Sequence, residues 1–497
     1  MRCLALIFLF VKFVQPLSIV VYLSLVGKSH VDFVSALINI LVERGHEVNP
    51  MNFCACSGIF DKSGPPTGSA KHACHNKWDT QSKRDGLASG EPARFLSRKK
   101  YDVGLTSDYD FCGYILFHQA GIKTVASFTA TNLFAHQAFS LGLPSPPSCV
   151  TGNFDKSSGS PRPDLFERTV RLLKSARFTF VERPEFEELG NGLIREFFGK
   201  GFPSTGELLR NSDLVFVNTN EIIEKPRPLS HKVKYIGGIA LRKPKPLPDH
   251  LGILLSNTTK NVIFSFGTQV PTEKIPLHIR KSLVKAFVQF PDVTFFWNYK
   301  MQGDEGDMFA NAYNVKLMEW LPQTDLLNDP RVVGFISHMG LNSFLEASTA
   351  GVPIVAIPLF ADQTHNAHNA AYRGTTVIVK PEQLTTESMK RALEKILYDP
   401  RYMENAKLIS QMMKGKPEMG REKFVEWIEF AAANKGLHRL LNLPGNDIGV
   451  LEYYCIDCML LLLFAFFAAL MFIWKITSKF VRIVRKEDIS QGKLKTN

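Results

Sequence analysis

The chain has 497 residues, of which 45% are hydrophobic and 21% are charged. This composition excludes a disordered chain, a collagen and a small disulfide-bonded fold, and the length predicts two or three domains. The formal net charge is +12, but from Lys475 onward seven basic residues stand against two acidic ones, so much of the excess is local. No basic run interleaved with aromatic residues lies elsewhere, so the sequence argues against nucleic-acid binding.

The N-terminus resembles a secretory signal peptide. Arg2 is followed by an apolar stretch from Cys3 to Val14, and residues 1–16 are predicted to be the signal. No small-residue cleavage pattern is evident, which leaves an uncleaved anchor as the alternative.

Residues 17–225 are predicted to form an N-terminal α/β domain. A helix is expected at 31–44, where apolar residues recur at helical spacing, and the expected strands are 18–26, 101–105, 124–126 and 214–218. Residues 51–98 lack a periodic apolar pattern and are expected to be irregular. Three cysteines in this stretch match no common zinc spacing, so no metal site is predicted.

Residues 226–250 contain five prolines and are predicted to be a stiff linker. Residues 251–445 are predicted to form a second α/β domain with trailing helices, because short apolar runs alternate with helical stretches. Its expected strands are 261–266, 293–297, 314–318, 332–337, 353–357 and 376–379, and its expected helices are 277–290, 343–350 and 363–372. We therefore expect an α/β fold of two doubly wound, Rossmann-like domains that face each other across a cleft.

Residues 455–474 are predicted to be one transmembrane helix, because they include an uncharged run bordered by aromatic residues. The basic tail 475–497 is expected in the cytosol by the positive-inside rule. Removal of a signal would make a single-pass type I protein with its bulk in a lumen, and the sequon at Asn257 agrees with a glycoprotein.

The densest pattern of polar residues runs from Trp320 to Ala367. It repeats the order of a strand, a tight turn and a helix start, and His338 and Gly340 follow the strand 332–337. The helix that begins near Asn342 directs unpaired N–H groups and its positive dipole end at this turn, which suits a phosphate group.

This stretch resembles the donor-binding signature of the UDP-glycosyltransferases, in particular the membrane-bound animal UDP-glucuronosyltransferases, and the late membrane span and a terminal dilysine pattern agree with it. The resemblance implies a GT-B type fold and a UDP-sugar co-substrate, with no cofactor and no metal. It assigns the uracil to Trp320, the nucleoside to Gln323, the ribose to Glu346, the diphosphate to His338, Gly340, Asn342 and Ser343, and the sugar to Asp362 and Gln363. Thr268 falls in the family's second phosphate-side loop.

The resemblance also implies a catalytic base, His30, which takes a proton from the acceptor as it attacks the sugar. Asp108 is the first choice for the acid that orients His30, and Asp110 is the second. Met339 departs from the family pattern, which has glycine there, and a positive φ at this position would disfavour methionine.

The predicted function is transfer of a hexose or glucuronic acid from a UDP-sugar to a hydroxyl of a small lipophilic acceptor, with inversion, in the endoplasmic reticulum membrane. The alternative is a catalytically impaired paralogue that binds UDP-sugar or partners active transferases, because residues 48–101 are shorter than the family's acceptor region. The sequence does not determine the donor sugar, the acceptor or whether a homo- or hetero-oligomer forms.

Overall fold

The computed structural model describes residues 15–23, 28–52, 89–150, 163–267, 270–301, 303, 305–417 and 420–494, with backbone only from 484. The chain divides into two compact units, Met1–Asn442 and Leu443–Asn497. The predicted signal lies almost wholly outside the described residues. Residues 53–88 of the predicted irregular stretch 51–98 also lie outside the described residues. The two ends of that stretch form regular structure, because residues 51 and 52 belong to a strand and residues 91–96 form a helix.

The first sheet of the large unit has six parallel strands in the order β2-β1-β3-β4-β5-β6. They are β1 (Ser18–Leu23), β2 (Glu47–Asn52), β3 (Val103–Ser107), β4 (Thr124–Thr129), β5 (Leu214–Val217) and β6 (Val233–Tyr235). The strands β3, β4 and β5 are buried almost throughout, which explains why they appear in the sequence as continuous apolar runs rather than as alternating patterns.

Helices cover this sheet on both faces. They are α1 (Lys28–Glu43), α4 (Glu91–Leu96), α5 (Cys112–Gln119), α6 (Ala135–Ser140), α7 (Leu165–Arg177), α8 (Arg183–Phe197) and α9 (Thr205–Arg210), with a π-helical turn at Phe178–Glu182. The helix α1 buries five apolar side chains, each of which contributes about 1.5–3 kcal/mol. It begins at Lys28, three residues earlier than predicted, so His30 lies in its first turn and not before it.

The second sheet also has six parallel strands, in the order β12-β11-β10-β7-β8-β9. They are β7 (Lys260–Ser265), β8 (Val293–Asn298), β9 (Val315–Met318), β10 (Val332–Ser337), β11 (Ile354–Ala356) and β12 (Thr376–Ile378). All six were predicted to within two residues at either end. Read from β9, this is the Rossmann strand order, which changes direction between β7 and β10. The predicted class of two Rossmann-like domains is therefore confirmed.

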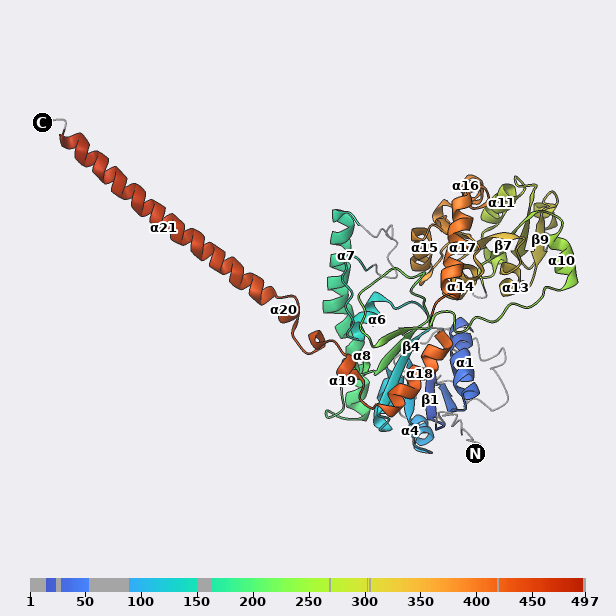
Figure 1. The fold of residues 1–497 in the computed structure, drawn as a ribbon, viewed down its shortest axis with the longest axis horizontal. Helices are drawn as coiled ribbons and strands as arrows, with labels where there is room; N and C mark the ends of the chain where they lie inside the picture. The colour runs from blue at the N-terminus through green and yellow to red at the C-terminus, as the bar shows by residue number, and fades with distance from the viewer. Residues whose placement is uncertain are drawn as a thin grey trace, which may run out of the picture. The chain divides into compact units, whose positions relative to one another are not determined.

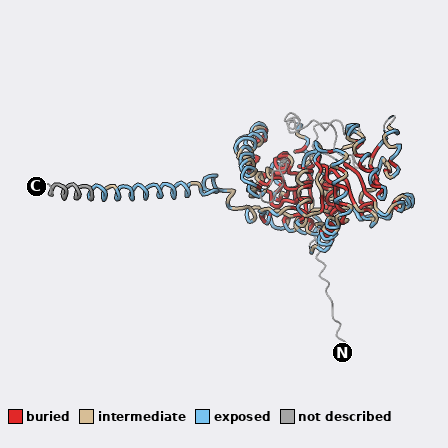
Figure 2. The backbone as a smooth tube through the Cα atoms, turned by 90° about the horizontal axis from the view of Figure 1, so that it is seen from above, coloured by how far each residue is buried: buried red, intermediate tan, exposed pale blue. Residues whose placement is uncertain are grey.

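Helices also flank the second sheet, where an aromatic-rich core packs around Phe264 and Trp297. They are α10 (Asp249–Leu255), α11 (Leu277–Phe287), α12 (Gly306–Phe309), α13 (Gln323–Leu327), α14 (Leu341–Ala350), α15 (Gln363–Tyr372), α16 (Thr386–Tyr398) and α17 (Pro400–Lys414), with 3-10 turns at Thr272–Lys274 and Pro381–Gln383. Figure 2 shows that buried residues concentrate in the interior of the large unit, and the strand residues are among them.

Two predicted boundaries are corrected by the structure. The stretch 226–250 is not only a linker, because the strand β6 lies between the two groups of prolines in this stretch and pairs with β5.

The helix α18 (Gly420–Ala433) does not trail the second domain but returns to pack beside α1, as Figure 1 shows. The rings of Phe424 and Phe216 lie 4.9 Å apart, and Arg44 donates to Glu429 at 3.0 Å. A short helix, α19 (His438–Leu441), follows.

The small unit consists of a 3-10 turn at Pro444–Asn446, α20 (Val450–Tyr453) and the long helix α21 (Ile456–Leu494). Residues Ile456–Ile483 of α21 are long and apolar enough to cross a membrane, and none of the apolar window is buried. A core helix of a soluble domain would be covered by neighbours, so an exposed apolar helix of this length fits a membrane span better. It begins one residue after the predicted start at 455 and extends beyond the predicted end at 474.

Candidate functional site

The diphosphate-side turn lies where the second sheet changes strand order. His338 follows β10 and Gly267 follows the neighbouring β7, and ligands of doubly wound sheets bind at the carboxyl ends of such strands. The His338 imidazole fits between two glycines: a Cβ on Gly267 would lie 2.9 Å from it and one on Gly340 would lie 2.6 Å from it. Thr268 lies outside the described residues.

His338 is buried, and this burial lowers its pKa to about 4. The ring is therefore neutral near pH 7, and one of its nitrogens donates while the other accepts. Its Nδ1 has no hydrogen-bond partner among the described residues. The ring can thus offer a hydrogen bond to an added group without breaking an existing one.

The helix α14 starts directly after Gly340, so Asn342 and Ser343 lie in its first turn. Asn342 accepts a hydrogen bond of 3.4 Å from Asn218, which follows β5 of the first sheet. Asn218 also donates to the carbonyl of Ala130, which follows β4. The carboxyl ends of the two sheets therefore meet at this turn within the large unit.

Met339 adopts a left-handed backbone conformation, with φ 66°. The positive φ that would disfavour methionine at this position is therefore present. A left-handed backbone conformation costs a residue with a side chain about 1–2 kcal/mol. Its side chain is fully buried in the core beneath the turn, and Ser337 accepts from its N–H at 3.1 Å. Burial of the side chain compensates for the strained backbone.

A second group of predicted residues forms a hydrogen-bonded cluster between α13 and α14. Gln323 donates to Ser343 at 3.1 Å and to one Glu346 oxygen, while Thr324 donates to the other at 2.7 Å. Each carboxylate oxygen of Glu346 keeps lone pairs for a further donor. Trp320, just before this cluster, is 71% exposed and offers a flat face.

Asp362 and Gln363 lie at the start of α15. Asp362 is buried, and burial raises the pKa of its carboxyl group. Asn366, one turn later, donates to Asp362 at 2.8 Å and to the carbonyl of Met339 at 2.9 Å, which ties this helix to the His338 turn. The side-chain oxygen Oε1 of Gln363 accepts from the backbone N–H groups of Leu359 and Phe360, at 2.7 and 3.1 Å.

His30 and Asp108 lie at the point where the first sheet changes strand order, since β1 and β3 are neighbours. The His30 ring meets the edge of the Tyr109 ring at 5.0 Å between centroids. The expected orienting hydrogen bond is not formed, because the His30 nitrogens and the Asp108 oxygens have no partner among the described residues. Burial lowers the pKa of His30 to about 4 and raises that of Asp108 well above its usual value.

Asp110, the second choice for the orienting acid, is already engaged. One oxygen accepts from the Cys112 N–H at 2.8 Å, at the start of α5, and the other from the Tyr22 hydroxyl at 3.4 Å. These contacts give Asp110 a structural role at the entry to the helix.

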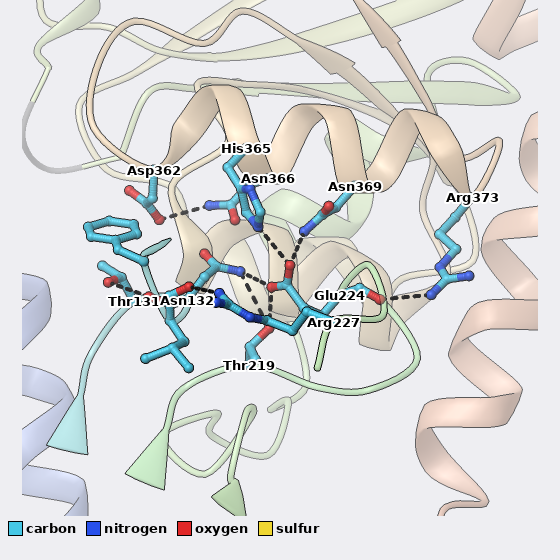
Figure 3. A network of polar contacts seen from close by, with 12 residues as sticks. Thr131, Asn132, Thr219, Glu224, Arg227, Asp362, His365, Asn366, Asn369 and Arg373 are labelled. Atoms are coloured by element: carbon cyan, nitrogen blue, oxygen red, sulfur yellow. Dashed lines mark hydrogen bonds and ion pairs between the residues drawn. The ribbon is translucent and has the colours of Figure 1, made fainter. Parts of the chain in front are cut away.

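Sequence reasoning did not find the most highly connected polar residue near the site, Glu224. We call the part of the large unit built on the first sheet, with α18, the first half and the part built on the second sheet the second half. Figure 3 shows Glu224 between these halves, with hydrogen bonds to residues of both. Glu224 precedes a Pro-rich stretch and belongs to no periodic pattern, so nothing in the sequence distinguished it from a surface carboxylate. Among the described residues, no group of three or more His, Cys, Asp or Glu side chains could hold a metal ion.

Two six-stranded parallel sheets whose carboxyl ends meet at a phosphate-suited turn form a fold of the GT-B type. Similar solved structures agree. A glycotransferase of kitacinnamycin aligns with TM-score 0.59 and 16% identity over 84% of this chain and 99% of the other. A UDP-glucose: anthocyanidin 3-O-glucosyltransferase in complex with UDP aligns with TM-score 0.56 and 14% identity over 85% and 100%.

The family model described as UDP-glucoronosyl and UDP-glucosyl transferase matches residues 87–490, and the chain belongs to this family. A putative UDP-glucuronosyltransferase, ugt-50, of Caenorhabditis elegans is 30% identical over 72% of this chain and 69% of its own length. UDP-glucuronosyltransferase 2B1 of Rattus norvegicus is 28% identical over 80% and 73%. The predicted resemblance is confirmed, and the chain is an animal-type UDP-glycosyltransferase that uses a UDP-sugar donor.

Proposed function

We propose that the chain transfers a hexose or glucuronic acid from its UDP-sugar to a hydroxyl of a small lipophilic acceptor, with inversion, and that His30 is the general base. The observation that carries this proposal is the imidazole of His30, which is neutral near pH 7, has no hydrogen-bond partner in the described part of the chain and lies near the strand-order change of the first sheet. An imidazole whose ring nitrogens make no hydrogen bond to the described residues has lone-pair and donor capacity available for a substrate.

The donor is proposed to lie along the second sheet's carboxyl end. Trp320 stacks on the uracil, Gln323 holds the nucleoside and Glu346 accepts from the ribose hydroxyls. His338, Gly340, Asn342 and Ser343, with Thr268, bind the diphosphate at the start of α14, and Asp362 and Gln363 bind the sugar. Helix-terminus N–H groups and His338 stabilise the charge of the departing UDP.

The proposed reaction is a single displacement. The acceptor oxygen forms a bond to the anomeric carbon as the bond from that carbon to the diphosphate oxygen breaks on the opposite side. His30 takes the acceptor proton, and UDP leaves with the bonding electron pair. Attack opposite to the leaving group inverts the anomeric configuration.

Asp108 is proposed to orient His30 and stabilise its charged form, because both Asp110 oxygens are occupied. A proton on His30 places a positive charge beside Asp108, which favours the ionised carboxylate. We expect the bond between them to form in the substrate complex, since catalytic hydrogen bonds often tighten only then.

The second candidate is a non-catalytic paralogue that binds UDP-sugar or partners active transferases. The unformed bond between His30 and Asp108 favours it, as does the strained Met339. The donor-side cluster is the same under both candidates, so donor binding does not separate them.

Acceptor-dependent release of UDP from membranes that carry the full chain tests the transferase. UDP-glucose and UDP-glucuronate are supplied in parallel with a panel of phenols and steroids. We expect release with one donor, and we expect His30→Ala to lower it by about 10²–10⁴-fold, the usual contribution of a general base. His136→Ala is the matched control, because partial burial also lowers the pKa of His136 to about 4, but this residue lies in α6, after β4.

Release that His30→Ala leaves unchanged would contradict the assignment of the base. If no donor gives release but UDP raises the melting temperature, the paralogue is the correct function.

We also propose that α21 crosses the endoplasmic reticulum membrane, with the part of the tail 475–497 that follows Ile483 in the cytosol and the catalytic unit in the lumen. The apolar Ile456–Ile483 segment and the basic residues after it support this orientation. In the lumen, Asn257 would be accessible for glycosylation, because it is exposed in the turn between α10 and β7.

A further inference from the structure

Glu224 is a buried carboxylate with four side-chain donors. Two come from the first half, where Thr219 donates at 3.1 Å and Asn132 donates to the same oxygen. The other two come from α15 of the second half, where His365 contacts the second oxygen at 2.7 Å and Asn369 donates to it at 2.8 Å. Figure 3 shows the carboxylate held between these donors.

The contacts follow one face of α15. His365 and Asn369 are one helical turn apart, so they project to the same side, and Arg373, a further turn on, donates to the backbone carbonyl of Glu224 at 2.8 Å. One residue of the first half therefore holds α15 at three successive turns. Rotation or sliding of the helix would break several of these bonds together.

The same helix carries the proposed sugar contacts. Asp362 and Gln363 lie in its first turn, and Asn366, next to His365, bonds both Asp362 and the Met339 carbonyl. The position of α15 relative to the first half therefore sets the distance between the sugar-contacting residues and the first sheet, where His30 lies.

The charge on Glu224 is maintained inside the protein. Burial alone would raise its pKa, but the charge and hydrogen bond of His365 and the bonds from Asn132 and Asn369 lower it to about 2. The carboxylate is thus ionised near neutral pH, and ionised acceptors make the stronger hydrogen bonds.

We propose that Glu224 is a positioning residue: by holding α15 against the first half, it places Asp362 and Gln363 for the sugar part of the donor, without touching the donor itself. This inference rests on the proposed role of Asp362 and Gln363. The UDP part binds to α13, α14 and the His338 turn, none of which Glu224 contacts through its side chain.

The test compares the affinities of the full chain for UDP, UDP-glucose and UDP-glucuronate, measured at equilibrium without acceptor. Glu224→Gln keeps the shape of the side chain but removes its charge. It also replaces one accepting oxygen by an amide N–H₂ group, which cannot accept hydrogen bonds from the surrounding donors. We expect it to raise the Kd of the bound UDP-sugar about tenfold and to change the Kd of UDP by less than about twofold. With acceptor, kcat/KM for the donor should fall in the same proportion or more.

Glu221→Gln is the matched control. Glu221 lies three residues away and also forms ion pairs with residues distant in the sequence, Lys416 and Lys423, but it is exposed and has no recorded bond to α15 among the described residues. Its variant should leave both affinities unchanged. Asn369→Ala removes one donor and leaves the carboxylate its other partners, so it should give a smaller rise in the Kd of the UDP-sugar and serves if Glu224→Gln does not fold.

Asp362→Asn separates two kinds of failure. If Asp362→Asn weakens UDP-sugar binding but Glu224→Gln and Asn369→Ala do not, the positioning role is wrong and the sugar contact stands. If Asp362→Asn also has no effect, the proposed sugar contact itself fails. An equal loss of UDP and UDP-sugar affinity in Glu224→Gln would show a general structural role and would overturn the proposal.

Discussion

Residues near this site that share a residue type or a backbone conformation differ in their hydrogen bonds and in their burial. Asp108 and Asp110 are two positions apart, yet Asp110 accepts from the first N–H of α5 and from a tyrosine hydroxyl, while the Asp108 oxygens make no recorded hydrogen bond among the described residues. Met339 and Ala361 share a left-handed backbone, with φ 66° and 54°, but only Met339 buries its side chain. The balance between strain and burial therefore differs at these two turns.

Glycine substitutions at the two turns should shift stability in opposite directions. In Met339→Gly, relief of about 1–2 kcal/mol of strain is outweighed by loss of a buried methionine, which costs about 2–5 kcal/mol even as alanine. Ala361→Gly relieves the same strain at an exposed residue, but the greater entropy of glycine in the unfolded chain offsets part of this gain, so the variant should be more stable by no more than about 1 kcal/mol. Melting temperatures of the detergent-solubilised full chain measure both effects. A higher melting temperature for Met339→Gly would show that the buried side chain does not compensate for the strain.

At the scale of elements, the second sheet was predicted closely because each of its strands is a short buried apolar run between helices of regular pattern. The segments β6 and α18 were misplaced for a different reason. Local pattern identifies an element but does not say which sheet it joins, and α18 crosses from the second half to the first. The phosphate-side turn was predictable from a strand followed by glycine and a helix start. The Glu224 cluster was not, since its donors are brought together only by the tertiary fold.

The return of α18 predicts a stability difference between two phenylalanines of that helix. Phe424 is fully buried against Phe216, so Phe424→Ala should destabilise by about 3–5 kcal/mol. Phe430 is 47% exposed, and Phe430→Ala should change stability by no more than about 0.5 kcal/mol. Thermal unfolding of the full chain compares them. Equal melting temperatures for the two variants would mean that α18 does not pack on the first sheet.

The whole molecule combines a nucleotide-sugar enzyme with an apolar helix long enough to span a bilayer. An acceptor that partitions into lipid is concentrated near the membrane, and a transferred sugar makes it more soluble in water. In the proposed orientation, the catalytic unit and the tail lie on opposite sides of the membrane. The side on which each part lies can be measured without knowledge of the substrate.

A glycan at Asn257 should report that the catalytic unit is luminal, because the sequon is completed by Thr259 and both residues are exposed. In cells that express the full chain, endoglycosidase treatment should increase its electrophoretic mobility. Asn257→Gln should abolish the change, and Thr259→Ser should preserve it, since serine also completes a sequon.

Protease added to sealed microsomes should remove only the part of the tail 475–497 that follows Ile483 and leave the large unit intact until detergent is added. Digestion of the large unit in sealed vesicles would place it in the cytosol and reverse the proposed orientation. Protection of the large unit without a glycan would retain the orientation and remove only the modification.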